Sequence, residues 1–360
     1  MKVSRRWLYA TVLFLPAIAI YFYIQKPDKM VININNNKTA NDLALPLEKR
    51  CYELYVAKSL STEGLISDGL YNEYPYDISQ ENHGNIYIAD KDSSRIFIFE
   101  NNGAYRTLFG KRGNGPGDLI RPLKVLPCKD YINIYDSGNS RISTFNKDGI
   151  FQSSFRIYNF YCDIAISKKG EYFAIPAIVQ PEYQKGLIHR LSSSGELIKS
   201  FGQIPPDINA PLQLWGRIAI NNEREEIYLL YINFLIVQIF NFDGELLKEV
   251  KIVNKDKEIK KRKNIDNFKK KNYEGPMYQL ADAIEATERG FMISISHPRV
   301  VFEEYDNQGI LLNCYWRNSN NEYSILRDFS ICESNGLKRF IVCYEGKYQP
   351  IEILEEKQNR

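Results

Sequence analysis

The sequence has few of the residues that most often carry catalysis or hold metals. It contains three histidines in 360 residues, and its six cysteines are scattered, with no C-x-x-C pair and no histidine at ligand spacing. A zinc site is therefore not expected. Glycine and proline together account for 36 residues. This tenth of the chain is too little for a collagen-like or low-complexity protein.

The chain also lacks a large net charge, which is only +3 at pH 7. A nucleic-acid partner is therefore not expected. The positive charge is concentrated between residues 251 and 271, where ten Lys or Arg residues accompany three acids. We interpret residues 251–275 as a basic insertion that forms a solvent-exposed loop. A docking site for anionic lipid headgroups or for an acidic partner is the alternative interpretation.

Long apolar runs are absent except at the N-terminus. Residues 7–24 carry no charge and follow three basic residues. As a helix they would be about 27 Å long, enough for a short membrane span. We predict that residues 1–30 are a signal anchor in the inner membrane, or a cleaved signal peptide, and that 31–49 are a polar tether. Either prediction places the rest of the chain in the cell envelope, outside the cytoplasm.

What the sequence does have is aromatic side chains, 47 in all, and a repeat. Residues 85–103 and 131–149 follow the same order of strand, polar turn, strand and glycine turn. The turn glycine recurs at intervals of 46, 46, 49 and 65 residues, at Gly103, Gly149, Gly195, Gly244 and Gly309. A period near 45 residues with four short strands is typical of a propeller blade.

Residues 50–360 therefore predict an all-β, six-bladed β-propeller. The last unit supplies only three strands, so we predict that residues 52–56 complete it as a fourth strand and close the ring. In this arrangement Leu54 and Val56 are expected to be buried. A two-sheet sandwich is the alternative architecture, and the regular period disfavours it.

Two segments carry a resemblance to a known family. Residues 84–90 and the loop 110–119 resemble the core and the inter-blade loop of NHL-repeat six-bladed propellers. Similar membrane-attached propellers occur in bacteria and are mostly uncharacterised. The resemblance implies the fold and says little about activity, because propellers serve as binding modules and as enzymes. The glycines of the loop lack a Gly-Lys-Ser/Thr ending and a following helix, so we interpret them as a tight crossover and not as a phosphate loop.

Charged residues stand near the start of each predicted innermost strand. Four strands offer an acid and two offer a base, in the order Asp77, Lys124, Asp163, Arg217, Asp282 and Asp328. If the blades align, these six side chains form a ring at one mouth of the central channel. One interpretation is structural, with each group satisfying backbone amides or pairing with its neighbour. The other is a ligand or cation site centred on Asp282 and Asp328, where like charges would recruit a cation.

Two functions remain open. The first is a membrane-tethered binding or scaffold module for a protein, peptide or glycan, with loops 180–186 and 204–215 lining one face and no cofactor. It is favoured by the repeat, by the N-terminal apolar segment and by the absence of a specific catalytic motif; for example, no serine stands in a nucleophile-elbow context. The alternative is a metal-dependent hydrolase or lyase. Gluconolactonase-like propellers hold a divalent cation with acidic and Asn residues, which are plentiful here, whereas the histidine-bound metal of propeller lyases has few potential ligands.

Overall fold

The computed structural model describes most of the chain after residue 50. The described segments are residues 51–60, 74–81, 84–177, 186–205, 216–254, 257–269, 278–296, 299–317, 325–334, 337–346 and 350–357. The predicted membrane segment 7–24 and tether 31–49 lie outside them, as do most of the loops 180–186 and 204–215. Within these described segments, no helix is long and apolar enough to cross a membrane.

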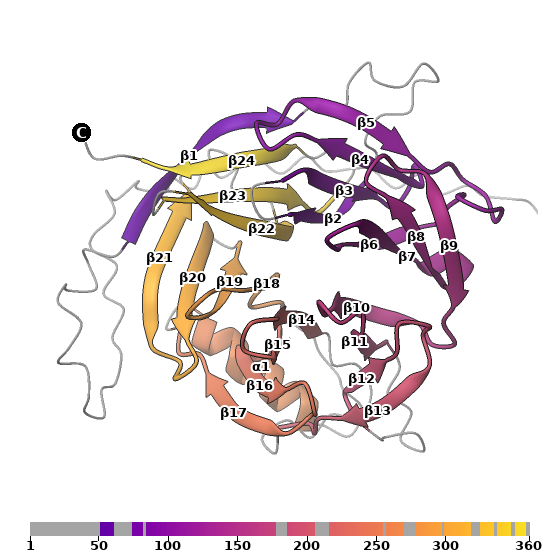
Figure 1. The fold of residues 1–360 in the computed structure, drawn as a ribbon. Helices are drawn as coiled ribbons and strands as arrows, with labels where there is room; N and C mark the ends of the chain where they lie inside the picture. The colour runs from indigo at the N-terminus through magenta and orange to yellow at the C-terminus, as the bar shows by residue number, and fades with distance from the viewer. Residues whose placement is uncertain are drawn as a thin grey trace, which may run out of the picture.

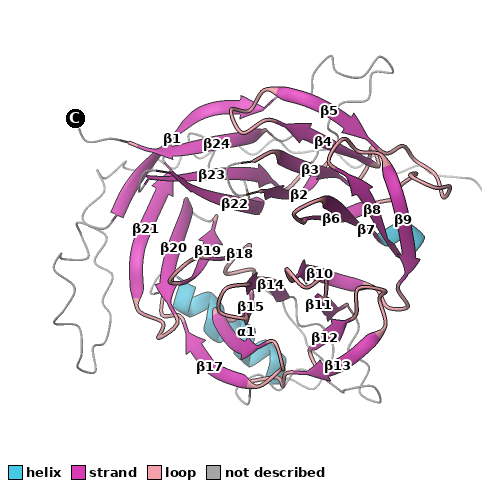
Figure 2. Ribbon diagram, in the orientation of Figure 1, coloured by secondary structure: helices cyan, strands magenta, loops and turns pink. Residues whose placement is uncertain are grey.

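The strands form radial antiparallel sheets around a common centre, with the first strand of each sheet innermost (Figures 1 and 2). The first blade contains β2 (Pro75–Gln80), β3 (Ile86–Asp90), β4 (Arg95–Phe99) and β5 (Tyr105–Phe109). The second contains β6 (Pro122–Pro127), β7 (Tyr131–Asp136), β8 (Arg141–Asn146) and β9 (Phe151–Arg156), with the 3-10 turn Ser137–Asn139 after β7. The third contains β10 (Tyr161–Ile166), β11 (Tyr172–Pro176), β12 (Ile188–Leu191) and β13 (Leu197–Phe201).

The remaining described strands complete a ring of six blades, as the repeat predicts. The fourth blade contains β14 (Gly216–Asn221), β15 (Glu226–Tyr231), β16 (Ile236–Asn241) and β17 (Leu246–Lys251). The fifth contains β18 (Ile284–Ala286), β19 (Gly290–Ile295), β20 (Val300–Asp306) and β21 (Leu311–Arg317). The sixth contains β22 (Leu326–Ser334), β23 (Leu337–Tyr344) and β24 (Ile351–Glu356), joined by β1 (Cys51–Leu60).

Burial follows the position of a strand in its blade. Every residue of β3 is buried, and so is every residue of β19, because neighbouring blades cover both faces of these second strands. The rim strand β13 is mostly exposed, and only Phe201 of its five residues is buried. In the described segments, the buried apolar residues form six clusters, each between two neighbouring blades.

The N-terminal strand β1 closes the ring. Its segment from Leu54 to Leu60 pairs antiparallel with β24, which confirms the predicted fourth strand of the last blade. Its first four residues pair in parallel with β21, which the sequence did not indicate. One strand thus joins the fifth and sixth blades into a single eight-stranded sheet.

The packing of β1 differs in one detail from expectation. Leu54 is buried against Phe340 and Leu354, as predicted. The side chain of Val56 is instead exposed, and the register of β1 against β24 shifts directly after it, between Val56 and Lys58. Leu60, beyond this bulge, is the second buried apolar residue of the strand.

The basic insertion contains a helix where we predicted a loop. Helix α1 (Glu258–Lys269) lies beside the fourth and fifth blades (Figure 2). The fully buried Asn264 holds it there: its amide nitrogen donates to the carbonyls of Asn233 and Tyr278, each at 2.7 Å, and its oxygen accepts from the Tyr278 amide at 2.8 Å. Ile265 of the same helix packs against the apolar cluster between the third and fourth blades. The many lysines of this segment conceal these anchoring residues when the sequence is judged by charge alone.

We predict that removing residues 1–48 leaves a folded propeller, whereas removing residues 1–60 lowers its melting temperature strongly. The second deletion loses the ladders to β21 and β24 and exposes the partners of Leu54 and Leu60, and burying each of these leucines contributes roughly 1.5–3 kcal/mol. Calorimetry of the two truncated chains checks this. Equal melting temperatures would show that β1 does not close the ring.

Candidate functional site

Four of the predicted charged residues follow a β-bulge in the innermost strand. The register shifts directly before Asp77 in β2, Lys124 in β6, Asp163 in β10 and Asp328 in β22. A bulge inserts one extra residue and turns the next side chain to the other face of the sheet. Because the bulge recurs at the same place in four blades, these four charged side chains arrive at the same level of the ring.

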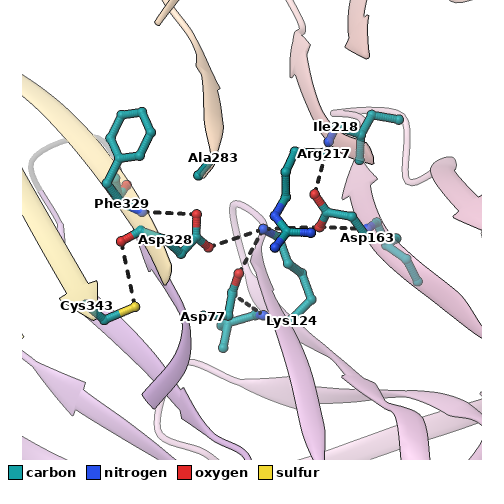
Figure 3. A network of polar contacts seen from close by, with 12 residues as sticks. Asp77, Lys124, Asp163, Arg217, Ile218, Ala283, Asp328, Phe329 and Cys343 are labelled. Atoms are coloured by element: carbon teal, nitrogen blue, oxygen red, sulfur yellow. Dashed lines mark hydrogen bonds and ion pairs between the residues drawn. The ribbon is translucent and has the colours of Figure 1, made fainter. Parts of the chain in front are cut away.

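The four side chains form one ion cluster, which we call the central cluster (Figure 3). The Lys124 Nζ lies 2.8 Å from Asp77 Oδ1, 3.4 Å from Asp163 Oδ1 and 3.4 Å from Asp328 Oδ2. All three aspartates are buried, and 21% of the Lys124 side chain is exposed. One ammonium group thus joins side chains from four blades.

The carboxylates of the central cluster also bind backbone amides. Asp77 Oδ2 accepts from the amide of Val125 at 2.8 Å, and Asp163 Oδ2 accepts from the amide of Ile218 at 3.0 Å. Each of these bonds reaches the innermost strand of the next blade. Asp328 Oδ1 accepts from the amide of Phe329 within its own strand, at 3.0 Å. The contacts therefore support the structural interpretation of these three aspartates.

The other two predicted residues behave differently. Arg217 lies beside the cluster on β14, whose register has no bulge (Figure 3). Asp282 is not part of the cluster, since Ala283 lies at the corresponding level. The backbone of Ala283 accepts from the Ser294 amide at 3.0 Å, and Asp282 bonds to Gln279 through its side chain. Our alignment of this blade was one residue off, and Asp282 does not form the expected acid pair with Asp328.

The charged groups of the central cluster shift one another's pKa values. Burial, and then the nearby Asp328, raise the pKa of Asp77 well above its usual range against the opposing charge of Lys124. Burial would also raise the pKa of Asp328, but Lys124 and the hydrogen bond from Asp77 hold it below its ordinary value. Burial disfavours the charge of Lys124, yet the three aspartates raise its pKa well above normal. Lys124 therefore stays protonated.

Sequence reasoning missed two residues near the cluster. Glu285 follows Ala283 by two positions, and burial together with the charge of Asp328 raises its pKa to about 8. The guanidinium carbon of Arg327 lies 3.7 Å from the centroid of the Tyr76 ring. Both Arg327 and Tyr76 are bulge residues, each directly before a cluster aspartate. The strand alternation could have identified Glu285 only once the register of β18 was known.

The central cluster already contains a cation. A metal ion bound by these carboxylates would have to displace the ammonium group of Lys124 from its three oxygen partners. Across the described segments, no group of three or more His, Cys, Asp or Glu side chains is arranged to hold a metal. The residues expected to hold one, Asp282 and Asp328, bind Gln279 and Lys124 instead.

A family model described as "6-bladed beta-propeller" matches residues 72–329, most of the chain and most of the ring. The chain belongs to this family. The six-bladed fold inferred from the repeat is thereby confirmed. No protein with a curated description matches the sequence.

Solved structures resemble this six-bladed propeller in fold. A protein of Bacteroides fragilis NCTC 9343 whose name proposes export has a TM-score of 0.54 and 13% identity, covering 86% of this chain and 99% of that one. An inactive variant of virginiamycin B lyase from Staphylococcus aureus, with quinupristin, has a TM-score of 0.51 and 12% identity over 84% and 99%. A luciferin-regenerating enzyme has a TM-score of 0.51 and 10% identity over 80% and 92%. At these identities the likeness shows the fold alone.

We predict that Lys124→Met destabilises the folded protein by about 3–5 kcal/mol at pH 7, because it leaves three buried carboxylates without their cation. The loss should shrink at pH 4.5, where protonation relieves the repulsion. Urea unfolding at both pH values measures it, with the exposed Lys129→Met as the matched control. A loss equal to that of the control would show that the cluster contributes nothing to stability.

We also predict that ionisation of Glu285 makes stability fall as pH rises. The folded-state pKa is about 8, whereas an unfolded glutamate titrates near 4.3. Between these two pKa values the folded chain binds a proton that the unfolded chain has lost. The contribution of protonated Glu285 to the free energy of unfolding is therefore complete below about pH 4 and is lost as the pH rises to about 8. Glu285→Gln should flatten the decline in melting temperature between pH 6 and pH 9. The exposed Glu288→Gln is the control, and an unchanged slope in Glu285→Gln would contradict the assignment.

Proposed function

We propose that this protein is a cell-envelope propeller, held at the inner membrane by residues 7–24, that binds a protein, peptide or glycan ligand through a carboxylate. The observation that carries the proposal is a pair of guanidinium groups, Arg217 and Arg327, at the inner end of the blades. We call them the arginine pair.

The charges of both arginines act on the same thiol. Burial raises the pKa of Cys162, and the positive charges of both arginines oppose that rise, so both lie near the same thiol. Tyr76 contacts the Arg327 guanidinium and also affects the pKa of Arg217 through its charge. All four side chains are partly exposed. The arginine pair is therefore accessible and next to an aromatic ring.

The arginine pair keeps donors that a ligand can use. Arg217 donates to the carbonyl of Gly216 at 3.3 Å. Within the described segments, no carboxylate lies within ion-pair distance of either guanidinium, since Lys124 holds the cluster aspartates. A guanidinium stacked flat on an aromatic ring leaves its in-plane N–H groups open to a planar anion. Carboxylates bind such a fork in a bidentate manner.

Aromatic side chains near this end suit a peptide or sugar. The loop between β9 and β10 ends in Phe160, just before the innermost strand that carries Cys162 and Asp163. Phe160 is 53% exposed and Tyr158 in the same loop is 91% exposed. Large exposed rings provide apolar contact area with little loss of side-chain entropy. They complement the arginine pair in a ligand that is partly apolar and carries a negative charge.

The metal-dependent hydrolase or lyase is less well supported. It requires acidic side chains that are available to a cation, and the central cluster commits its aspartates to Lys124 and to backbone amides. The location outside the cytoplasm is supported by the apolar segment 7–24 after its basic flank. The name of the Bacteroides fragilis protein of similar fold agrees with that location.

We predict that the purified full chain binds carboxylate ligands and not their esters. The probes are an oligogalacturonate and its methyl ester, and an acidic peptide with a free or an amidated C-terminus. Arg217→Gln and Arg327→Gln should each weaken binding about tenfold in calorimetric titrations, by loss of a bidentate contact. The rim variant Arg156→Gln is the matched control. Equal affinity for acid and ester, or full affinity in both arginine variants, would overturn the proposal.

A further inference from the structure

Two cysteines face each other where the N-terminal strand meets the fifth blade. Cys51 of β1 and Cys314 of β21 are direct partners in the parallel register. The next pair in that register, Tyr52 and Tyr315, stacks with ring centroids 5.2 Å apart. This stacking shows that paired side chains of the two strands lie side by side. None of the other four cysteines has a cysteine as its register partner in the described strands.

The spacing of the two strands suits a covalent bond. Neighbouring strands lie about 4.7–4.9 Å apart, and disulfides join residues whose Cα atoms are roughly 4.4–6.8 Å apart. The Cys51 and Cys314 thiols already contact each other through a hydrogen bond. Cys314 is buried, and Cys51 is partly exposed and can be reached by a reagent.

We propose that Cys51 and Cys314 form a disulfide that fastens the N-terminal strand to the fifth blade. The Cys51 thiolate attacks a disulfide donor and releases one donor thiol, which leaves a mixed disulfide on Cys51. The Cys314 thiolate then attacks the Cys51 sulfur and releases the second donor thiol. The donor disulfide gains the two electrons and the two protons that the cysteine thiols lose.

The protonation of the two thiols agrees with this order of attack. The hydrogen bond with Cys314 is the main effect that lowers the pKa of Cys51, against the opposing effect of burial. The same hydrogen bond, with burial, raises the pKa of Cys314. Cys51 therefore ionises first and is also the more accessible of the two. It is the thiol that begins the exchange.

The disulfide would strengthen the weakest part of the closing strand. Only four residue pairs join β1 to β21, whereas six join it to β24. Short ladders at the end of a strand open first. Cys51 also stands directly after the predicted tether, so the bond would hold the point at which the chain enters the ring. In the cell the bond rests on the proposed oxidising location outside the cytoplasm, while its geometry can be tested on the purified chain alone.

The test is oxidation of the purified full chain with excess oxidised glutathione, followed by alkylation under denaturing conditions. We expect four alkylated cysteines by mass spectrometry, six after reduction, and a peptide in which Cys51 is linked to Cys314. The oxidised chain should also migrate faster on a non-reducing gel, because the bond closes a loop from residue 51 to residue 314. Six alkylated cysteines after oxidation, or a link between other cysteines, would overturn the inference.

Variants separate this bond from nonspecific oxidation. Cys51→Ser should keep all five remaining cysteines open to alkylation, whereas Cys314→Ser should stop at the mixed disulfide, with one glutathione on Cys51 and four alkylated cysteines. Both variants should lose the faster migration. Cys128→Ser, which changes a thiol in the second blade, should keep the link and show three alkylated cysteines. The melting temperature should rise by several degrees on oxidation of the wild type and stay unchanged in Cys51→Ser. A link that persists without Cys51, or a rise equal in both proteins, would contradict the assignment.

Discussion

Charge compensation at the centre of the ring is the interaction on which this structure depends. Innermost strands of several blades bring carboxylates to one level, where burial and mutual repulsion would force the blades apart. A single ammonium group, on Lys124, contacts three of these carboxylates at 2.8–3.4 Å. Asp77 and Asp163 also accept hydrogen bonds from amides of the next blade, so the same carboxylates take part in charge compensation and in contact between blades. Replacing both members of a buried ion pair by apolar residues often changes stability little. Removing only one member destabilises the protein strongly, because the other charge stays buried without a partner.

The central cluster also determines the charge of the surface next to it. The aspartates are held by Lys124, so the positive charge of Arg217 and Arg327 is left without a carboxylate of the described segments at ion-pair distance. Glu285, with a pKa of about 8, is mostly uncharged at neutral pH and does not neutralise the arginines either. The centre of the ring thus presents positive charge toward solvent, although four acids lie within it. The carboxylate ligand proposed above would complement that surface.

Much of the fold could be predicted because each blade repeats the same order of strands and turns. Most blades combine four short strands with a glycine turn, and this arrangement produces a period in the sequence. The central cluster was found for the same reason, through acids that recur at one position. Asp282 was misassigned because Ala283, one residue later, lies at the level that the bulges set in four other blades, and a bulge leaves no recognisable residue pattern in the sequence. The contact between Cys51 and Cys314 could not be predicted for another reason. The two residues are far apart in the sequence, and only the register of the parallel strands β1 and β21 brings them together.

The position of β1 has a consequence for the order in which the molecule is made. Its residue Tyr55 bonds to Glu355, 300 residues later, so the strand synthesised first reaches its final partner last. At about 5–20 residues per second, a ribosome needs roughly 15–60 s to supply that partner. Throughout this time β1 has no completed sheet to join, and the earlier blades can assemble without it. The ring is therefore completed only once the C-terminal strand has emerged, and a chain that ends before β24 leaves the segment of β1 from Leu54 to Leu60 without its antiparallel partner.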